Sequence, residues 1–203
     1  MKNMTILDRE LGQNIKIMAQ VIGDICHRST LVSATPINLT SNQFTILQVL
    51  STGGDFQISD LARLLDISNA AISKNIDRLE LLKLVARQTK PGDRRSLDII
   101  LLDGGIEILR NYDQIHATKQ ELLLEQFSDP EKRALLDLVK KVVIYTLAGE
   151  QDTELLCLQC GGSCGDNCVI ESCKGLCAMP DKKKARQSAE ARQGSPDRGP
   201  DVK

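Results

Sequence analysis

Two amphipathic segments separated by a short break constrain the fold of this 203-residue chain more than any other feature. Their apolar stripes are Leu61, Ala62 and Leu65 in the first and Ile72, Ile76 and Leu79 in the second, at helical spacing. Residues 66–67 form the break, and Ser68 then stands at the N-cap position of the second segment. Two short helices joined by a tight turn predict a helix-turn-helix.

Two strand-like runs follow these helices, at residues 84–89 and 97–102. Residues 90–96 between them contain a Pro-Gly pair and several basic residues, which is typical of a turn. A helix-turn-helix followed by a basic β-hairpin is a winged helix, a structure that reads duplex DNA. The predicted fold class is therefore mainly α with a small β-wing, in which long dimerisation helices flank the winged helix.

The run DRRSLDIILLDGG at residues 93–105, placed after LARLLDISNAAISKNIDRLE, resembles the wing signature of the MarR family of bacterial transcription regulators. The family pattern is D-x-R followed a few residues later by L-T-x-x-G, and the resemblance extends over about residues 5–148. This chain has Leu102 in place of the usual Thr, and Lys83 where a Gly often ends the recognition helix. The resemblance implies a dimer that binds double-stranded DNA.

The outward face of the second short helix is the expected reader of the major groove. Its candidate contacts are Ser68, Asn69, Ala70, Ser73, Lys74 and Arg78, although any single member could equally be a solvated surface residue. In the wing, the resemblance implies that Arg95 enters the minor groove and that Asp93 orients it. Arg94 would meet backbone phosphate, and Lys90 completes the candidate set.

Charge supports this assignment locally and not globally. The chain has 26 basic and 27 acidic residues, so its net charge is −1. Residues 68–95, in contrast, carry seven basic and three acidic side chains, and seven minus three leaves a local excess of +4 that favours binding to phosphate. Aromatic residues make up only 2% of the chain and Trp is absent, which disfavours a base-stacking platform for single strands.

Long apolar helices on either side of the winged helix predict a homodimer. Residues 5–27 form one apolar seam, residues 29–38 are expected to be a loop, and a capping box at residues 40–43 starts a helix that ends at Gly53. Residues 56–58 suggest a short strand beside the wing, and two further helices should end near residues 127 and 148. These seams exceed what the small winged domain can cover, so we expect a symmetric dimer rather than a monomeric bundle.

Past residue 149 the chain carries a cysteine cluster with the spacing C-x2-C-x3-C-x3-C-x4-C-x3-C. Its members are Cys157, Cys160, Cys164, Cys168, Cys173 and Cys177. Thiolates are soft ligands that favour iron–sulfur clusters, zinc or Cu(I), and six thiols with interleaved glycines suit a cluster of the 4Fe-4S type. Zinc remains the alternative, although a second C-x2-C knuckle is missing, and thiol redox chemistry is also open.

These patterns divide the chain into a winged-helix and dimerisation domain (residues 1–149), a cysteine-rich metal-binding segment (150–180) and a disordered charged tail (181–203). The absence of a signal sequence or membrane-spanning run predicts a cytoplasmic protein.

The predicted function is a DNA-binding regulator of a palindromic operator, modulated by the cysteine-ligated centre. The alternatives are a small-molecule-responsive repressor with a structural zinc tail and an electron carrier or enzyme. No phosphate loop or catalytic triad pattern supports an enzyme.

Overall fold

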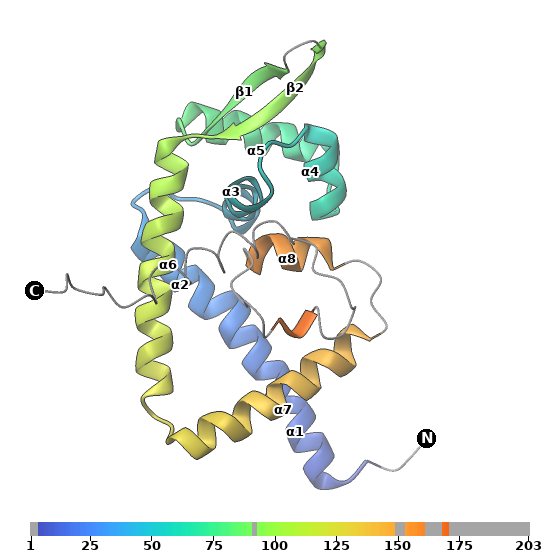
Figure 1. Cartoon of the computed structure of the whole chain (residues 1–203), viewed down its shortest axis with the longest axis vertical. Helices are drawn as coiled ribbons and strands as arrows, with labels where there is room; N and C mark the ends of the chain where they lie inside the picture. Colours follow the sequence, from blue (N-terminus) through green and yellow to red (C-terminus); the bar gives the residue numbers. More distant parts are fainter. Residues whose placement is uncertain (1–3, 91–92, 149–152, 161–167, 171–203) are drawn as a thin grey trace, which may run out of the picture.

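The computed structural model describes residues 4–90, 93–148, 153–160 and 168–170. It is mostly helical with a two-stranded antiparallel wing, which confirms the predicted fold class (Figure 1). The elements are α1 (Ile6–Gln20), the π-helix η1 (Val21–Cys26), α2 (His27–Ala34), α3 (Ser41–Gly53), α4 (Ile58–Leu65), α5 (Asn69–Leu81), β1 (Val85–Lys90), β2 (Asp93–Leu101), α6 (Asp103–Leu124), α7 (Asp129–Leu147) and α8 (Glu154–Cys160). Within the described residues, no helix is both long and apolar enough to cross a membrane.

The N-terminal helical run is longer than its sequence predicts. The expected loop at residues 29–38 is wrong over its first half, because η1 and α2 continue the helix to Ala34. The hydroxyls of Ser29 and Thr30 donate to the Cys26 carbonyl at 3.0 and 2.8 Å. Leu31 and Ala34 are buried against the core, so tertiary packing outweighs the weak helix propensity of this serine- and threonine-rich stretch.

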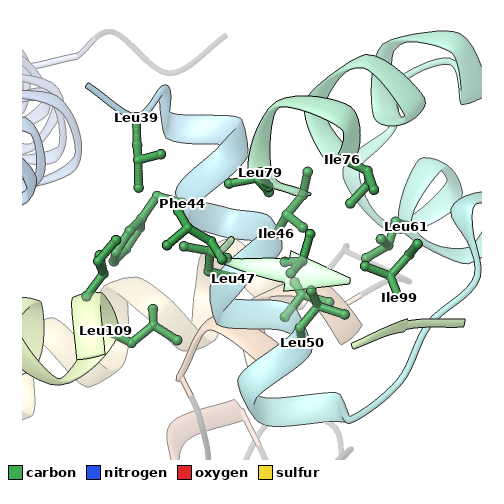
Figure 2. Close-up of a cluster of buried hydrophobic side chains, with 14 of the residues drawn as sticks. Leu39, Phe44, Ile46, Leu47, Leu50, Leu61, Ile76, Leu79, Ile99 and Leu109 are labelled. Carbon is green, nitrogen blue, oxygen red and sulfur yellow. The ribbon is translucent and has the colours of Figure 1, made fainter. Parts of the chain in front are cut away.

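The core is built around α3 (Figure 2). As predicted, α3 begins with a capping box, in which Thr40 Oγ1 accepts from Gln43 N at 3.2 Å and Gln43 Oε1 accepts from Thr40 N at 3.0 Å. Its C-cap is Gly54, whose φ of 88° lies in the left-handed region that glycine tolerates. Side chains from α4, α5, β2 and α6 surround α3, among them Leu61, Ile76, Leu79, Ile99 and Leu109.

The wing is a longer hairpin than expected. β1 and β2 pair in register from Val85 with Leu101 to Thr89 with Leu97, and after a register shift Lys90 pairs with Asp93. The sequence predicts a turn over residues 90–96, on the basis of the Pro-Gly pair and the basic residues. In the structure, residues 93–96 instead belong to β2. The expected strand at residues 56–58 reduces to a single bridge between Phe56 and Ile99, because α4 already begins at Ile58.

Beyond the wing, α6 runs away from the winged helix and α7 turns back across the far end of the molecule (Figure 1). α7 has the predicted start, with a capping box between Ser128 and Glu131 and Pro at the first turn. Apolar side chains remain exposed on these helices and on the N-terminal run, including Leu7, Leu11, Ile22, Ile25, Leu122, Leu123, Leu136 and Leu138. α2 packs against α6, whereas these exposed residues lack cover within the described part of the protomer.

Candidate nucleic-acid interface

A left-handed residue and an N-cap together set the angle of the helix-turn-helix. The C-cap of α4 is Asp66, which has a φ of 52°, and the N–H of Ile67 donates to the Ala62 carbonyl at 3.1 Å. Ser68 then caps α5 as predicted, because its Oγ accepts from Ala71 N at 3.2 Å. The chain therefore reverses within three residues and presents α5 at the surface.

α5 buries one stripe and exposes the opposite face. Ile72, Ile76 and Leu79 are 0% exposed, which confirms the predicted apolar stripe. On the other face, the candidate contacts Ser68, Asn69, Ala70, Lys74 and Arg78 are exposed, and Ser73 is half-buried. The structure therefore brings the predicted helix residues together on one accessible surface, and their contact with DNA stays a prediction.

The predicted wing residues lie near the tip of the hairpin, which projects from the end of the molecule opposite α7 (Figure 1). Lys90 ends β1, and Asp93, Arg94 and Arg95 begin β2. Their backbone positions are described, whereas their side chains and residues 91–92 lie outside the described part of the chain. The roles assigned to Arg95, Asp93, Arg94 and Lys90 therefore also stay predictions.

Arg87, which the sequence indicates only as one of the basic surface residues, fastens the wing to α5. Arg87 of β1 donates to the carboxylates of Asp77, at 2.5 Å, and Glu80. The hydrogen bond with Asp77 raises the pKa of the Arg87 guanidinium, which remains charged. Arg87 is thus committed to two acids on the reading helix rather than to phosphate. Acids three residues apart on an exposed helix face look like ordinary solvated charges in sequence, so no signal marked this contact.

A second polar cluster joins the long helices to α3. His27 Nδ1 and Tyr112 Oη are hydrogen-bonded at 2.7 Å, and the Tyr112 ring stacks on His116 with centroids 5.8 Å apart. Burial lowers the pKa of His27, and the charge of His116 lowers it further. A pocket of about 490 Å³ is lined by Arg28, by Leu31 and by residues of the α2–α3 connection.

The cysteine cluster is only partly described. Cys157 and Cys168 are buried and Cys160 is half-buried, whereas Cys164, Cys173 and Cys177 lie outside the described residues. Among the residues that the structure does describe, no three His, Cys, Asp or Glu side chains are grouped so that they could hold a metal ion. The six-cysteine ligand set therefore stays a prediction.

The region of the chain that matches known proteins includes the helices of this candidate interface. A family model described as "MarR family" matches residues 37–96, which contain α3, α4, α5 and β1. The chain is 31% identical over 136 residues to the HTH-type transcriptional regulator PecS of Dickeya dadantii, and the match covers 61% of this chain and 82% of PecS.

Solved structures share the fold. Wild-type MarR of E. coli in its apo form aligns with a TM-score of 0.51 and 26% identity, covering 65% of this chain and 96% of that one. A point mutant of S. aureus MepR, bound to an oligodeoxyribonucleotide, aligns with a TM-score of 0.50 and 19% identity, covering 64% and 95% of the two chains. The latter likeness establishes a common fold.

Proposed function

The chain belongs to the MarR family of winged-helix transcriptional regulators, and we propose that it binds a palindromic duplex operator as a homodimer. The observation that carries this proposal is the exposed face of α5, from Ser68 to Arg78, held above a fully buried stripe. A helix presented in this way fits the major groove, and a two-fold dimer presents two such helices to two half-sites about one duplex turn apart.

The chemistry of the α5 face suits a mixture of base and backbone contacts. Asn69 and Arg78 carry hydrogen-bonding groups for base edges or phosphate, and Ala70 is small enough to lie against a thymine methyl group. Ser73 and Lys74 suit either kind of contact. We further propose that Arg95 reaches the minor groove, where a guanidinium meets enhanced negative potential.

Selection from a random-sequence duplex library by the full chain tests the proposed DNA binding. We expect enrichment of an inverted repeat whose half-site centres lie about 10 base pairs apart. Sequences that remain as diverse as the starting library after repeated rounds would contradict the proposal. The selected duplex then serves as the probe for every variant described below.

Arg95→Ala tests the role of the wing on that duplex. We expect a loss of about 1–3 kcal/mol of binding free energy at each half-site, and so roughly 2–6 kcal/mol for the dimer, because one groove contact is removed from each protomer. Gel-shift titration at fixed salt measures the affinity. The matched control is Arg133→Ala, since Arg133 is exposed and lies on α7 at the opposite end of the molecule from the wing. Equal affinities of the two variants would remove Arg95 from the interface.

We also propose how DNA binding is regulated: cysteines among residues 157–177 hold an iron–sulfur cluster that modulates DNA affinity. Support comes from six soft ligands within a glycine-rich run of 21 residues. Iron and acid-labile sulfide analysis of the full chain isolated without oxygen tests it. Zinc alone in stoichiometric amount would instead support a structural tail, and the pocket near Arg28 would then be the place to seek an anionic effector.

A further inference from the structure

α8 is built into the winged-helix core although it follows the last long helix in the chain. Leu158 is only 3% exposed and belongs to the same buried cluster as the α3 side chains. α8 contacts both α3 and α4, and it lies on the side of these helices away from the wing (Figure 1). It therefore supports the helix-turn-helix from behind and leaves the exposed face of α5 open.

A short line of contacts leads from α8 to the wing. Gly53 ends α3, and a Cβ at this position would lie 3.0 Å from Leu158 Cδ2 and 2.5 Å from the Phe56 ring. The Phe56 carbonyl in turn accepts a hydrogen bond of 2.8 Å from the Ile99 N–H of β2. Leu158 thus packs where the α3–α4 connection is tied to the strand that carries Arg95.

A second contact leads from α8 to the start of α5. Arg63 of α4 donates from Nη1 to Glu154 Oε2 at 3.2 Å. Both side chains are substantially exposed, so this ion pair orients α8 and contributes little to holding it in place. Arg63 also lines a shallow depression together with Ser68 and Asn69, the first candidate contacts of the reading helix.

We propose that α8 is a positioning element for DNA binding: the docked position of α8 is the one that binds DNA, and its displacement from α3 and α4 lowers affinity. The proposal rests on the proposed DNA-binding function. Cys157, which is 6% exposed, and Cys160 lie three residues apart and therefore on neighbouring positions of one helix side. A chemical change at these thiols acts on a helix that supports α4. The cysteine segment thus reaches the reading helix through α8.

Leu158→Asn and Leu156→Asn form a matched pair of variants that tests the proposal in the full chain. Leu156 lies on the same helix but is 45% exposed, so its substitution leaves the docked contact intact. We expect Leu158→Asn to weaken binding of the selected duplex about tenfold, within the usual range of coupling between sites, and Leu156→Asn to change it less than twofold. Wild-type affinity of a folded Leu158→Asn protein would overturn the proposal.

Hydrogen exchange on the unaltered protein provides a test that does not depend on the variant's folding. Because coupling is reciprocal, DNA that prefers docked α8 must stabilise the docking by the same factor. Saturation with the selected duplex should slow amide exchange in residues 154–160 about fivefold or more, relative to a scrambled duplex of equal length. Exchange in α7 serves as the reference. An unchanged rate in residues 154–160 would overturn the proposal.

The two proposals fail in different ways. If the full chain enriches no duplex, the DNA-binding function fails and takes the role of α8 with it. If a duplex is enriched and bound, but either the affinity of a folded Leu158→Asn protein or the exchange of α8 is unaffected, only the role of α8 fails.

Discussion

Gly105, the glycine of the wing motif, occupies a place where a side chain has no room. A Cβ there would lie 2.7 Å from the Leu84 carbonyl oxygen and 2.6 Å from Leu101 Cδ1. Gly105→Ala should therefore lower the free energy of unfolding by about 1–3 kcal/mol, the usual cost of overpacking. Urea denaturation measures it.

Gly104→Ala is the control for this prediction. Its Cβ would lie 3.3 Å from Leu84 Cδ2 and from the Lys83 carbonyl oxygen, so a small shift accommodates it. We expect a cost below about 1 kcal/mol, because alanine also has the better helix propensity. Equal losses for the two variants would contradict the steric explanation.

At the residue scale, the sequence predicts local structure where one residue type has one physical purpose. Ser68 and the Thr40 capping box were predicted from their position alone, since a short hydroxyl side chain satisfies free N–H groups there. Lys83, which departs from the family's glycine, has a φ of 57°, so the backbone keeps the left-handed conformation at a cost of roughly 1–2 kcal/mol. The Arg87 contact was missed because its partners are distant in sequence and ordinary in type.

At the scale of elements, the join between the wing and α5 depends on Arg87. Arg87→Met keeps the length of the side chain and removes its hydrogen bonds to Asp77 and Glu80. We expect stability to fall by about 1–2 kcal/mol, since these acids are partly exposed, and amide exchange in β1 to accelerate. The control is Gln88→Met on the neighbouring exposed residue of the same strand. Unaltered β1 exchange in Arg87→Met would show that the wing is held by its apolar contacts alone.

The stability of the packing between α2, α3 and α6 should depend on pH because of His27. Burial places the pKa of His27 below its unfolded value of 6.5, so the unfolded chain binds more protons between the two values. The contribution of neutral His27 to the free energy of unfolding is therefore fully present above pH 6.5, and it is lost as the pH falls towards the pKa of His27 in the folded protein.

Comparison of His27→Phe with the wild type isolates this effect. The substitution keeps a ring beside Phe44 and removes the titration. The wild type should lose more stability than the variant when urea denaturation is repeated at pH 7.5 and 5.5. Burial raises the pKa of Asp113, so this residue increases the stability of the folded protein as the pH falls, opposite to the effect of His27. Asp113 and His116 are present in both proteins, so they do not account for a difference between them. Identical pH dependence would exclude His27 as the cause.

Two elements escaped sequence reasoning for the same physical reason. α2 has residues of low helix propensity, and α8 is a short apolar segment among cysteines. Each is stabilised by packing against a surface formed elsewhere in the chain, α6 in one case and α3 with α4 in the other. Periodicity within a segment cannot reveal such a partner. The π-helix η1, likewise, leaves no pattern in the sequence that distinguishes it from an α-helix.

At the scale of the whole molecule, the fold class was predictable because apolar periodicity, capping residues and turn residues agreed along residues 40–105. The remaining question at this scale is how the apolar seams of α1, α6 and α7 are covered. Two-fold symmetry offers the simplest answer, because each exposed seam then meets an equivalent surface of a second chain. The same symmetry explains why a palindromic duplex is the expected partner.

Leu11→Lys tests the dimer. Leu11 is 57% exposed in the protomer and lies within the α1 seam, and a symmetric interface contains the substitution twice. Loss of about 1.5–3 kcal/mol at each of the two buried leucines, roughly 3–6 kcal/mol per dimer, therefore weakens association by about 150- to 20,000-fold. Sedimentation analysis over a range of concentrations measures the shift to monomer. Gln13→Lys, which adds the same charge to the opposite face of α1, should leave the dimer intact, because residue 13 lies about half a turn from the seam.

Since operator affinity requires two linked reading helices, Leu11→Lys should also lose binding to the full palindrome at concentrations where it is monomeric. A dimeric Leu11→Lys protein would place the interface on another surface.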